Sequence, residues 1–161
     1  MLDRLYNAAL EQRKLAWQQR RESITRFDQF KWLTGLRQAG AEGLGALALG
    51  AERGMLIRLD NAVRSFFRRC RSVQAPGFPR FRPLQRMQCI DVVQVSGGMV
   101  RRRKNGHVLR IKGFPHMRLR PSRELPDGGA LRAVRIVRKP QGVSFCARIG
   151  SNAVPRPAAA D

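Results

Sequence analysis

The chain has 161 residues, of which 32 are Lys or Arg and 11 are Asp or Glu, so its formal net charge is +21. Because 43% of the residues are hydrophobic, the composition favours a folded chain with a core over a disordered polycation. The longest apolar stretch, Gly43–Ala51, is far shorter than the roughly 18 to 20 residues of a membrane-spanning helix, so we expect no membrane span.

Apolar residues recur at helical spacing through the first half of the chain. A stripe over Leu2–Trp17 predicts the first helix. A second helix is expected over about Thr25–Arg37, where the first residue and Asp28 have the spacing of a capping box. A third stripe covers Met55–Cys70 and predicts a helix with a basic end. Between them, Gln38–Gly54 is rich in glycine and is expected to be a linker or a poorly formed helix start.

The second half of the chain changes to a period of two residues. The prolines of Pro76–Pro83 forbid a helix and predict a rigid, extended connector. Alternating patterns after the connector predict strands, and Asn105-Gly106 and Lys139–Gly142 are typical of hairpin turns between them. The expected strands are Cys89–Val95, Met99–Lys104, His107–Lys112, Leu131–Arg138 and Val143–Ile149.

This order of elements predicts an α+β fold in two segments. Residues 1–75 would form the helical segment, and residues 76–150 a basic segment whose strands make a small antiparallel sheet or barrel. Residues 151–161, with two prolines and four alanines, are expected to be a flexible tail.

The three cysteines lie far apart, at Cys70, Cys89 and Cys146, and none belongs to a C-x-x-C pair. An odd count without close spacing fits neither a zinc site nor a disulfide framework, so we expect reduced, structural thiols. The N-terminus shows no basic region followed by an apolar core, which is the pattern of a secretory leader. These features favour a cytoplasmic location.

Most of the positive charge lies in the second half of the chain. Residues 68–139 carry 19 basic and three acidic residues, a net charge of +16, which predicts binding to a polyanion such as nucleic acid. A merely solvated basic surface is the alternative. Arg80 and Arg82 are the first candidates, because the proline-stiffened backbone that carries them loses little freedom on binding. The other candidates are two basic clusters and two aromatic residues that would either stack on bases or pack beneath the connector: Arg68, Arg69, Arg71, Arg101, Arg102, Arg103, Lys104, Phe78 and Phe81.

The sequence offers no convincing catalytic or metal-binding centre. Metal-assisted phosphodiester cleavage requires several carboxylates that converge on one or two metal ions. The chain has only eleven acidic residues, and most of them are expected on helix faces or at caps. His107 and His116 have no further ligand at metal-binding spacing, and the serines lack a G-x-S-x-G context. We therefore expect no catalytic residue, no bound metal and no cofactor.

Four short segments together carry a more specific pattern. They are Tyr6–Glu11, Leu33–Arg37, Leu59–Arg69 with its F-F-R-R block, and above all Pro76–Arg82, which reads P-G-F-P-R-F-R. In these segments the chain resembles the N-terminal half of the OrfB-type (TnpB-like) transposon proteins. That family comprises RNA-guided DNA endonucleases related to the type V CRISPR effectors. The resemblance covers roughly Leu5–Ile149.

The resemblance implies that the helices belong to a recognition lobe and that the strands form an OB-like, wedge-like barrel. This barrel would hold the guide RNA scaffold and a short target-adjacent DNA motif. The chain begins inside the family's first long helix and stops before the RuvC-like nuclease domain, whose metal-binding acids and zinc-ribbon cysteines have no counterpart in it. We therefore expect a truncated transposase fragment, not itself an enzyme, that binds RNA or DNA, RNA scaffold above duplex DNA, without cleaving it.

Three alternatives stay open beside this expectation. The chain could be a subunit whose nuclease half is encoded separately, a generic basic DNA-binding protein, or a non-functional remnant of a transposase gene. We expect no membrane partner, and the sequence leaves the oligomeric state open.

Overall fold

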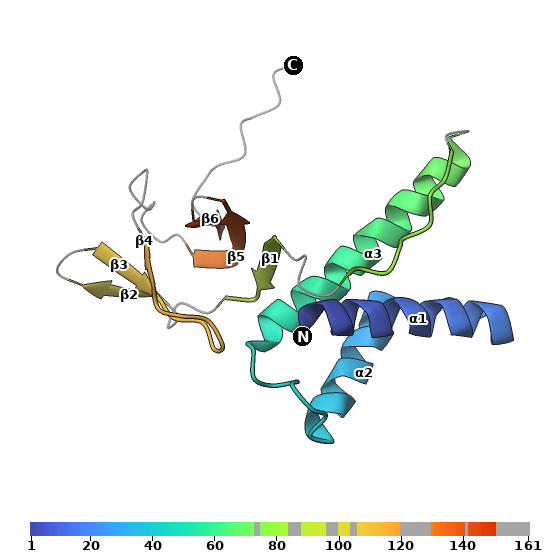
Figure 1. Cartoon of the computed structure of the whole chain (residues 1–161), viewed down its shortest axis with the longest axis horizontal. Helices are drawn as coiled ribbons and strands as arrows, with labels where there is room; N and C mark the ends of the chain where they lie inside the picture. The colour runs from blue at the N-terminus through green and yellow to red at the C-terminus, as the bar shows by residue number, and fades with distance from the viewer. Residues whose placement is uncertain are drawn as a thin grey trace, which may run out of the picture.

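The computed structural model describes residues 1–72, 75–83, 88–95, 100–103, 106–119, 130–140 and 142–150. Within these residues three helices precede six strands, which confirms the predicted α+β class. Figure 1 shows the helices on one side and the strands on the other. The elements are α1 (Leu2–Arg20), α2 (Arg26–Gln38), α3 (Leu49–Arg71), β1 (Cys89–Val93), β2 (Val100–Arg103), β3 (Gly106–Leu109), β4 (Met117–Leu119), β5 (Ala130–Lys139) and β6 (Gly142–Gly150).

The three helices pack their apolar stripes together into a first core, which is built mainly from α1 and α3 and receives Leu33 from α2. The N-terminus of α2 has the predicted capping box, because the Thr25 side chain accepts from the Asp28 amide while the Asp28 carboxylate accepts from the Thr25 amide. The buried members of this core are Leu2, Leu5, Tyr6, Ala9, Leu10, Leu33, Met55, Leu56 and Leu59.

A buried polar network joins the three helices beside this core. The guanidinium of Arg13 donates to Gln29 Oε1 at 2.9 Å and to Asp60 Oδ1 at 3.1 Å. The Gln29 amide nitrogen in turn donates to the Ala9 carbonyl at 2.8 Å. Since each helix contributes one member, the network fixes how α1, α2 and α3 are placed relative to each other.

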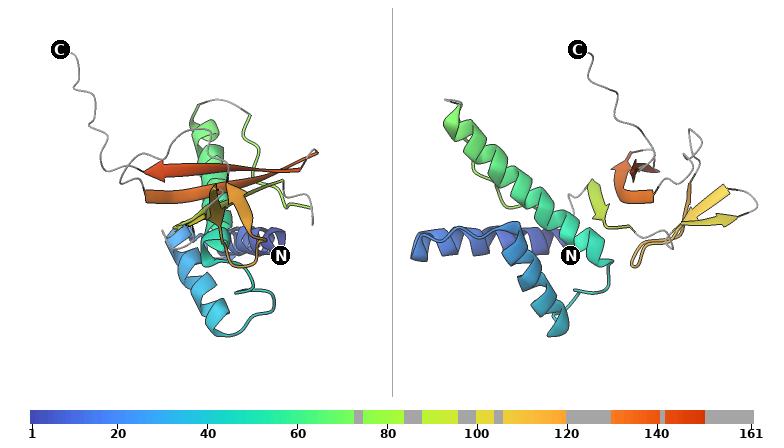
Figure 2. Two further views of the ribbon diagram at one scale, coloured as in Figure 1. Left: turned by 90° about the vertical axis from the view of Figure 1, so that its left-hand side faces the viewer. Right: turned by 180° about the vertical axis from the view of Figure 1, so that it is seen from behind.

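The strands form two antiparallel three-stranded sheets, in the orders β1-β5-β6 and β2-β3-β4. In the part of the chain that the structure describes, these sheets stay open and do not close into the barrel that the family resemblance implied. Figure 2 shows the long β5–β6 pair passing in front of α3 in its left-hand view. Both sheets and the start of α3 share a second core, whose buried members are Ala48, Ala51, Val92, Val95, Leu109, Ile111, Met117, Val134 and Ile136.

Helix α3 begins at Leu49, earlier than predicted, so Gly50 and Gly54 lie inside the helix and not in a linker. A Cβ on Gly54 would overlap the carbonyl oxygen of Asp91, and one on Gly50 would overlap that of Val93. The two glycines, one helical turn apart, therefore let the β1 backbone approach the helix directly. The sequence left a linker or a poorly formed helix start open for Gln38–Gly54; the residues from Leu49 on are the helix start, and this packing accounts for the glycines in it.

These contacts cover the free edge of β1. Gln88 O accepts from the Arg138 amide, so even-numbered residues of β1 face β5 and odd-numbered carbonyls point away from it. The Cys89 carbonyl accepts from the Arg58 side chain at 2.9 Å, and the next two outward carbonyls meet the glycines of α3. Helix α3 thereby occupies an edge that would otherwise be open to pairing with another chain.

The strands differ from the prediction by more than one residue in three places. Strand β1 stops at Val93 because Gln94 has a φ of 57°, which extended backbone does not allow. Strand β3 stops at Leu109, before the turn that contains Gly113. The three residues of β4 were not predicted, because so short a segment carries no alternation that can be recognised.

Both predicted hairpins pair as expected. Arg103 faces Gly106 across β2 and β3, and Lys139 faces Gly142 across β5 and β6. Three other expectations, the turn residue Asn105, the strand residue Met99 and the tail at 151–161, lie outside the described residues. None of the helices in the described ranges has the length and apolar character needed to cross a membrane.

Candidate nucleic-acid interface

The proline-rich connector over residues 75–83 lies extended beside the helices (Figure 1), and side chains fix it at both ends. The Asn7 side chain pairs with the Arg82 backbone, donating to its carbonyl at 2.9 Å and accepting from its amide at 2.8 Å. At the other end, Arg69 donates to the Gly77 carbonyl at 2.9 Å. Because an amide side chain replaces the missing strand partner, the segment keeps its extended form without belonging to a sheet.

The two connector arginines have different surroundings. Arg80 is exposed, and no ion pair is found for it among the described residues. Arg82 is half-buried, with its guanidinium carbon 4.6 Å from the centre of the Tyr6 ring. Arg80 is therefore the freer cation of the two, whereas Arg82 also helps to fix the connector on α1.

The basic end of α3 lies next to this connector. Arg68 and Arg71 are exposed, and Arg69 is half-buried because it reaches the connector backbone. Between Asp60 and Asp91 the sequence holds seven arginines and no acidic residue. The structure thus brings two of the predicted clusters, one on α3 and one on the connector, into a single basic surface.

The third predicted cluster lies elsewhere. Arg101, Arg102 and Arg103 belong to β2, in the sheet farthest from the end of α3 in Figure 1. How their side chains lie, and where Lys104 lies, is outside the described residues. Exposed cations that the sequence did not single out flank this sheet: Arg110, Lys112 and Arg118. Among the described residues, the β2 cluster therefore lies in a different part of the fold from the surface on α3 and the connector.

Both connector phenylalanines are partly exposed. Phe78 meets the ring of Phe66 edge to face, with 5.1 Å between ring centres, and still exposes 39% of its surface. Phe81 is 49% exposed. The Lys14 ammonium lies 5.6 Å from the Phe78 ring centre and 4.6 Å from that of Phe81. Packing and stacking on a ligand were the two predicted alternatives, and the rings pack on one side and leave the other open.

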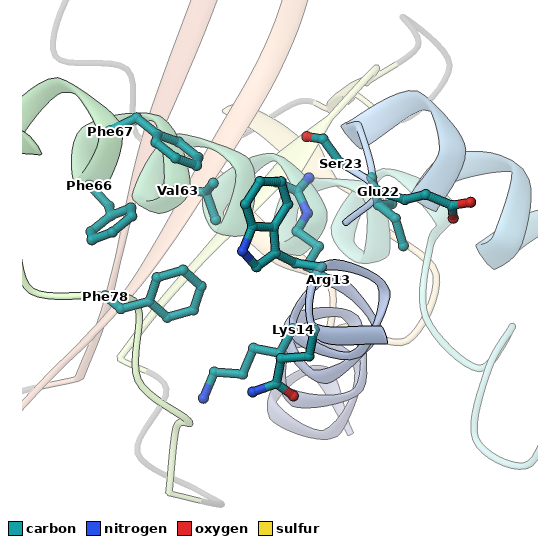
Figure 3. A pocket seen from close by; sticks show the side chains of 11 residues that line it. Arg13, Lys14, Glu22, Ser23, Val63, Phe66, Phe67 and Phe78 are labelled. Atoms are coloured by element: carbon teal, nitrogen blue, oxygen red, sulfur yellow. The ribbon is translucent and has the colours of Figure 1, made fainter. Parts of the chain in front are cut away.

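A cleft of about 400 Å³ opens beside Phe78, between α1, α3 and the segment that joins α1 to α2. Figure 3 shows the rings of Phe66, Phe67 and Phe78 together on one side of it, with Arg13 and Lys14 entering from α1. The lining is mainly apolar, and it is formed by Arg13, Lys14, Trp17, Gln18, Glu22, Ser23, Ile24, Val63, Phe66, Phe67 and Phe78.

The sequence did not predict this cleft. Trp17 and Phe67 both continue apolar helical stripes, a pattern typical of core residues, yet each exposes 53% of its surface. An apolar stripe does not reveal whether another element covers it, and none of the described elements covers the ends of α1 and α3 at these two rings. Lys14 was assigned only to the polar face of the first helix, although its ammonium lies beside both connector rings.

A carboxylate on β1 holds the sheet to α3 on the same face of the helix as its two glycines. Asp91 accepts from Arg58 at 2.7 Å and from Arg135 at 2.6 Å. Burial raises the pKa of Asp91, but its hydrogen bonds and attraction to the two guanidinium groups outweigh burial, and the pKa stays below its usual range. This group is therefore ionised and acts as a structural anchor.

No group of three His, Cys, Asp or Glu side chains suited to a metal ion occurs within the described ranges. Of the cysteines, Cys70 is exposed and free, and Cys89 is half-buried and free. Neither a protein-family model nor a curated protein matches this chain. The chemistry of the interface therefore depends on the chain's own side chains, which are cations and aromatic rings on a fixed backbone.

Proposed function

We propose that this protein binds nucleic acid through the basic surface formed by the end of α3 and the connector, and that it does so without a cleavage centre of its own. Its residue patterns support the N-terminal half of an OrfB-type transposon protein, whose ligand would be a structured RNA in preference to duplex DNA. A nuclease half could be supplied by a second chain.

One observation carries the proposal. Arg80 is exposed on a backbone that Asn7 and Arg69 hold at both ends, and Arg68 and Arg71 lie exposed beside it. Cations on an anchored backbone lose little conformational entropy when they contact phosphates, and the surrounding sequence has no carboxylate to compete with the ligand. An ordinary solvated surface would not require its arginines to be placed in this way.

The test is the salt dependence of binding, measured with fluorescently labelled RNA and duplex DNA. The variant R68A/R71A/R80A should bind more weakly, and the slope of log K against log salt should fall by about 0.7 to 0.9 for each lost phosphate contact. Arg4→Ala, an exposed arginine at the start of α1, is the matched control and should leave the slope unchanged. Equal slopes for all three proteins would refute the proposed surface.

Two further measurements separate the alternatives. Sequencing of the nucleic acid that stays bound through a stepwise salt wash should show enrichment of one RNA, whereas a generic basic protein would retain an unselective mixture. A cooperative thermal transition would exclude a remnant that does not fold. Incubation of a plasmid with the protein and Mg²⁺ or Mn²⁺ should give no nicking unless a nuclease partner is added.

A further inference from the structure

The cleft beside the connector presents aromatic surface that no element in the described part of the chain covers. Trp17 and Phe67 are each 53% exposed and Phe78 is 39% exposed. The Phe66 ring packs edge to face against the rings of Phe67 and Phe78, at ring-centre distances of 5.2 and 5.1 Å. Exposed aromatic groups that gather in one hollow mark a binding site more than scattered apolar residues do.

The charges around the cleft restrict the occupant. Lys14 lines it, and the guanidinium of Arg21 lies 5.7 Å from the centre of the Trp17 ring. Glu22 is the one acidic side chain in the lining, and it is paired with Arg20 at 2.8 Å. A second copy of a chain with a net charge of +21 would be repelled, so the occupant should combine negative charge with flat apolar groups.

We infer that the cleft binds unpaired nucleobases of single-stranded nucleic acid, which stack on Trp17, Phe67 and Phe78 while Lys14 contacts the backbone phosphate. The inference deepens the proposed function and rests on it. Sites of 300 to 1,000 Å³ accommodate drug-sized ligands, so a cleft of about 400 Å³ has room for a base. Bases paired inside a duplex cannot enter it, and single strands should therefore be preferred.

The experiment measures the anisotropy of a labelled ten-nucleotide oligo(dT), which has no secondary structure, against a hairpin duplex. Trp17→Ala and Phe67→Ala should each weaken oligo(dT) binding about 5- to 100-fold and leave duplex binding nearly unchanged. Trp17→Phe keeps a ring in place and should retain most of the affinity. Phe27→Ala removes an aromatic residue that is 59% exposed on α2, outside the cleft, and is the matched control.

Salt dependence distinguishes stacking from charge. The W17A change should shift the oligo(dT) affinity at every salt concentration without altering the slope, whereas Lys14→Ala should lower the slope by about 0.7. Far-UV circular dichroism of each variant checks that the helices persist. In the variant W32F, Trp17 is the only tryptophan, and its fluorescence should be quenched by oligo(dT).

The outcomes separate the two proposals. If folded W17A and F67A bind oligo(dT) as F27A does, the cleft inference is overturned and the basic surface stands. A cleft that instead holds an apolar segment of a protein partner would give this same result. If the unaltered chain binds neither probe, the proposed function fails and the cleft inference fails with it.

Discussion

The close approach of β1 to α3 makes the substitution Gly54→Ala a sensitive test of the fold. A methyl group at this position would overlap the Asp91 carbonyl oxygen, and the carbonyl carbon would lie 2.9 Å from it, inside the 3.0 Å that real Cβ atoms keep. Both obstacles are backbone atoms, so no change of rotamer relieves the contact and the strand must move away from the helix.

The expected loss follows from two opposing effects. Overpacking of this kind costs about 1 to 3 kcal/mol, and an obstacle made of backbone belongs near the upper limit. Alanine has a better helix propensity than glycine, which stabilises the variant by about 1 kcal/mol. The net loss in the free energy of unfolding is therefore about 2 kcal/mol, which corresponds to a fall in Tm of roughly 4 to 8 °C for a chain of this size.

The assay is thermal unfolding followed by far-UV circular dichroism, with Gly35→Ala as the control. Gly35 lies in α2, and a methyl group there would meet nothing within 4 Å. G35A should gain about 1 kcal/mol from helix propensity and melt a few degrees higher. A G54A protein that melts at or above the temperature of the unaltered chain would show that β1 does not pack on α3 as described.

Three other perturbations test the contacts that fix the site and the sheet. Asn7→Ala removes both hydrogen bonds to the Arg82 backbone, so it should cost about 1 to 2 kcal/mol and speed tryptic cleavage of the connector; unchanged cleavage would mean that the connector is held by other contacts. Thr25→Ala should lower the stability by about 1 kcal/mol through loss of the capping box, whereas T25S should retain it, as unfolding in urea will show. Because the pKa of Asp91 lies below its ordinary value of 3.8, its contribution to stability is complete above about pH 5 and is lost as the pH falls below 3.8 and through the lower folded value. Asp91→Asn should remove this part of the acid dependence, and identical acid profiles of the two proteins would contradict it.

Local pattern was sufficient for the first two helices. The period of 3.6 residues and the Thr25–Asp28 pair predict α1 and α2 almost to the residue, because both features act within one or two turns. The start of α3 was missed because Gly50 and Gly54 favour a helix only when β1 lies against them. That contact joins residues far apart in the sequence, and helix propensity, which is a local property, does not depend on it.

The candidate site likewise has one part that the sequence predicts and one part that it does not. Charge density and proline content were enough to select Arg68, Arg71 and Arg80, all of which are exposed, on the end of α3 and on the connector that Arg69 joins to it. The aromatic cleft was not predictable, because Trp17 and Phe67 have the spacing of core residues. Whether such a ring is buried depends on which element covers it, and that is a property of the whole fold.

The pairing order of the first sheet has a consequence for how the chain folds during synthesis. Among the described strands β1 pairs only with β5, so Cys89 cannot pair with Val137 until all of β2–β4 has been made. The three helices precede β1 in the chain and can pack first, but the glycine face of α3 has no paired strand against it until β5 is made. Such non-local pairing is slow. While the intervening strands are translated, a nascent chain would therefore have folded helices and an unpaired β1. During this interval the exposed strand edge makes the chain most prone to aggregation.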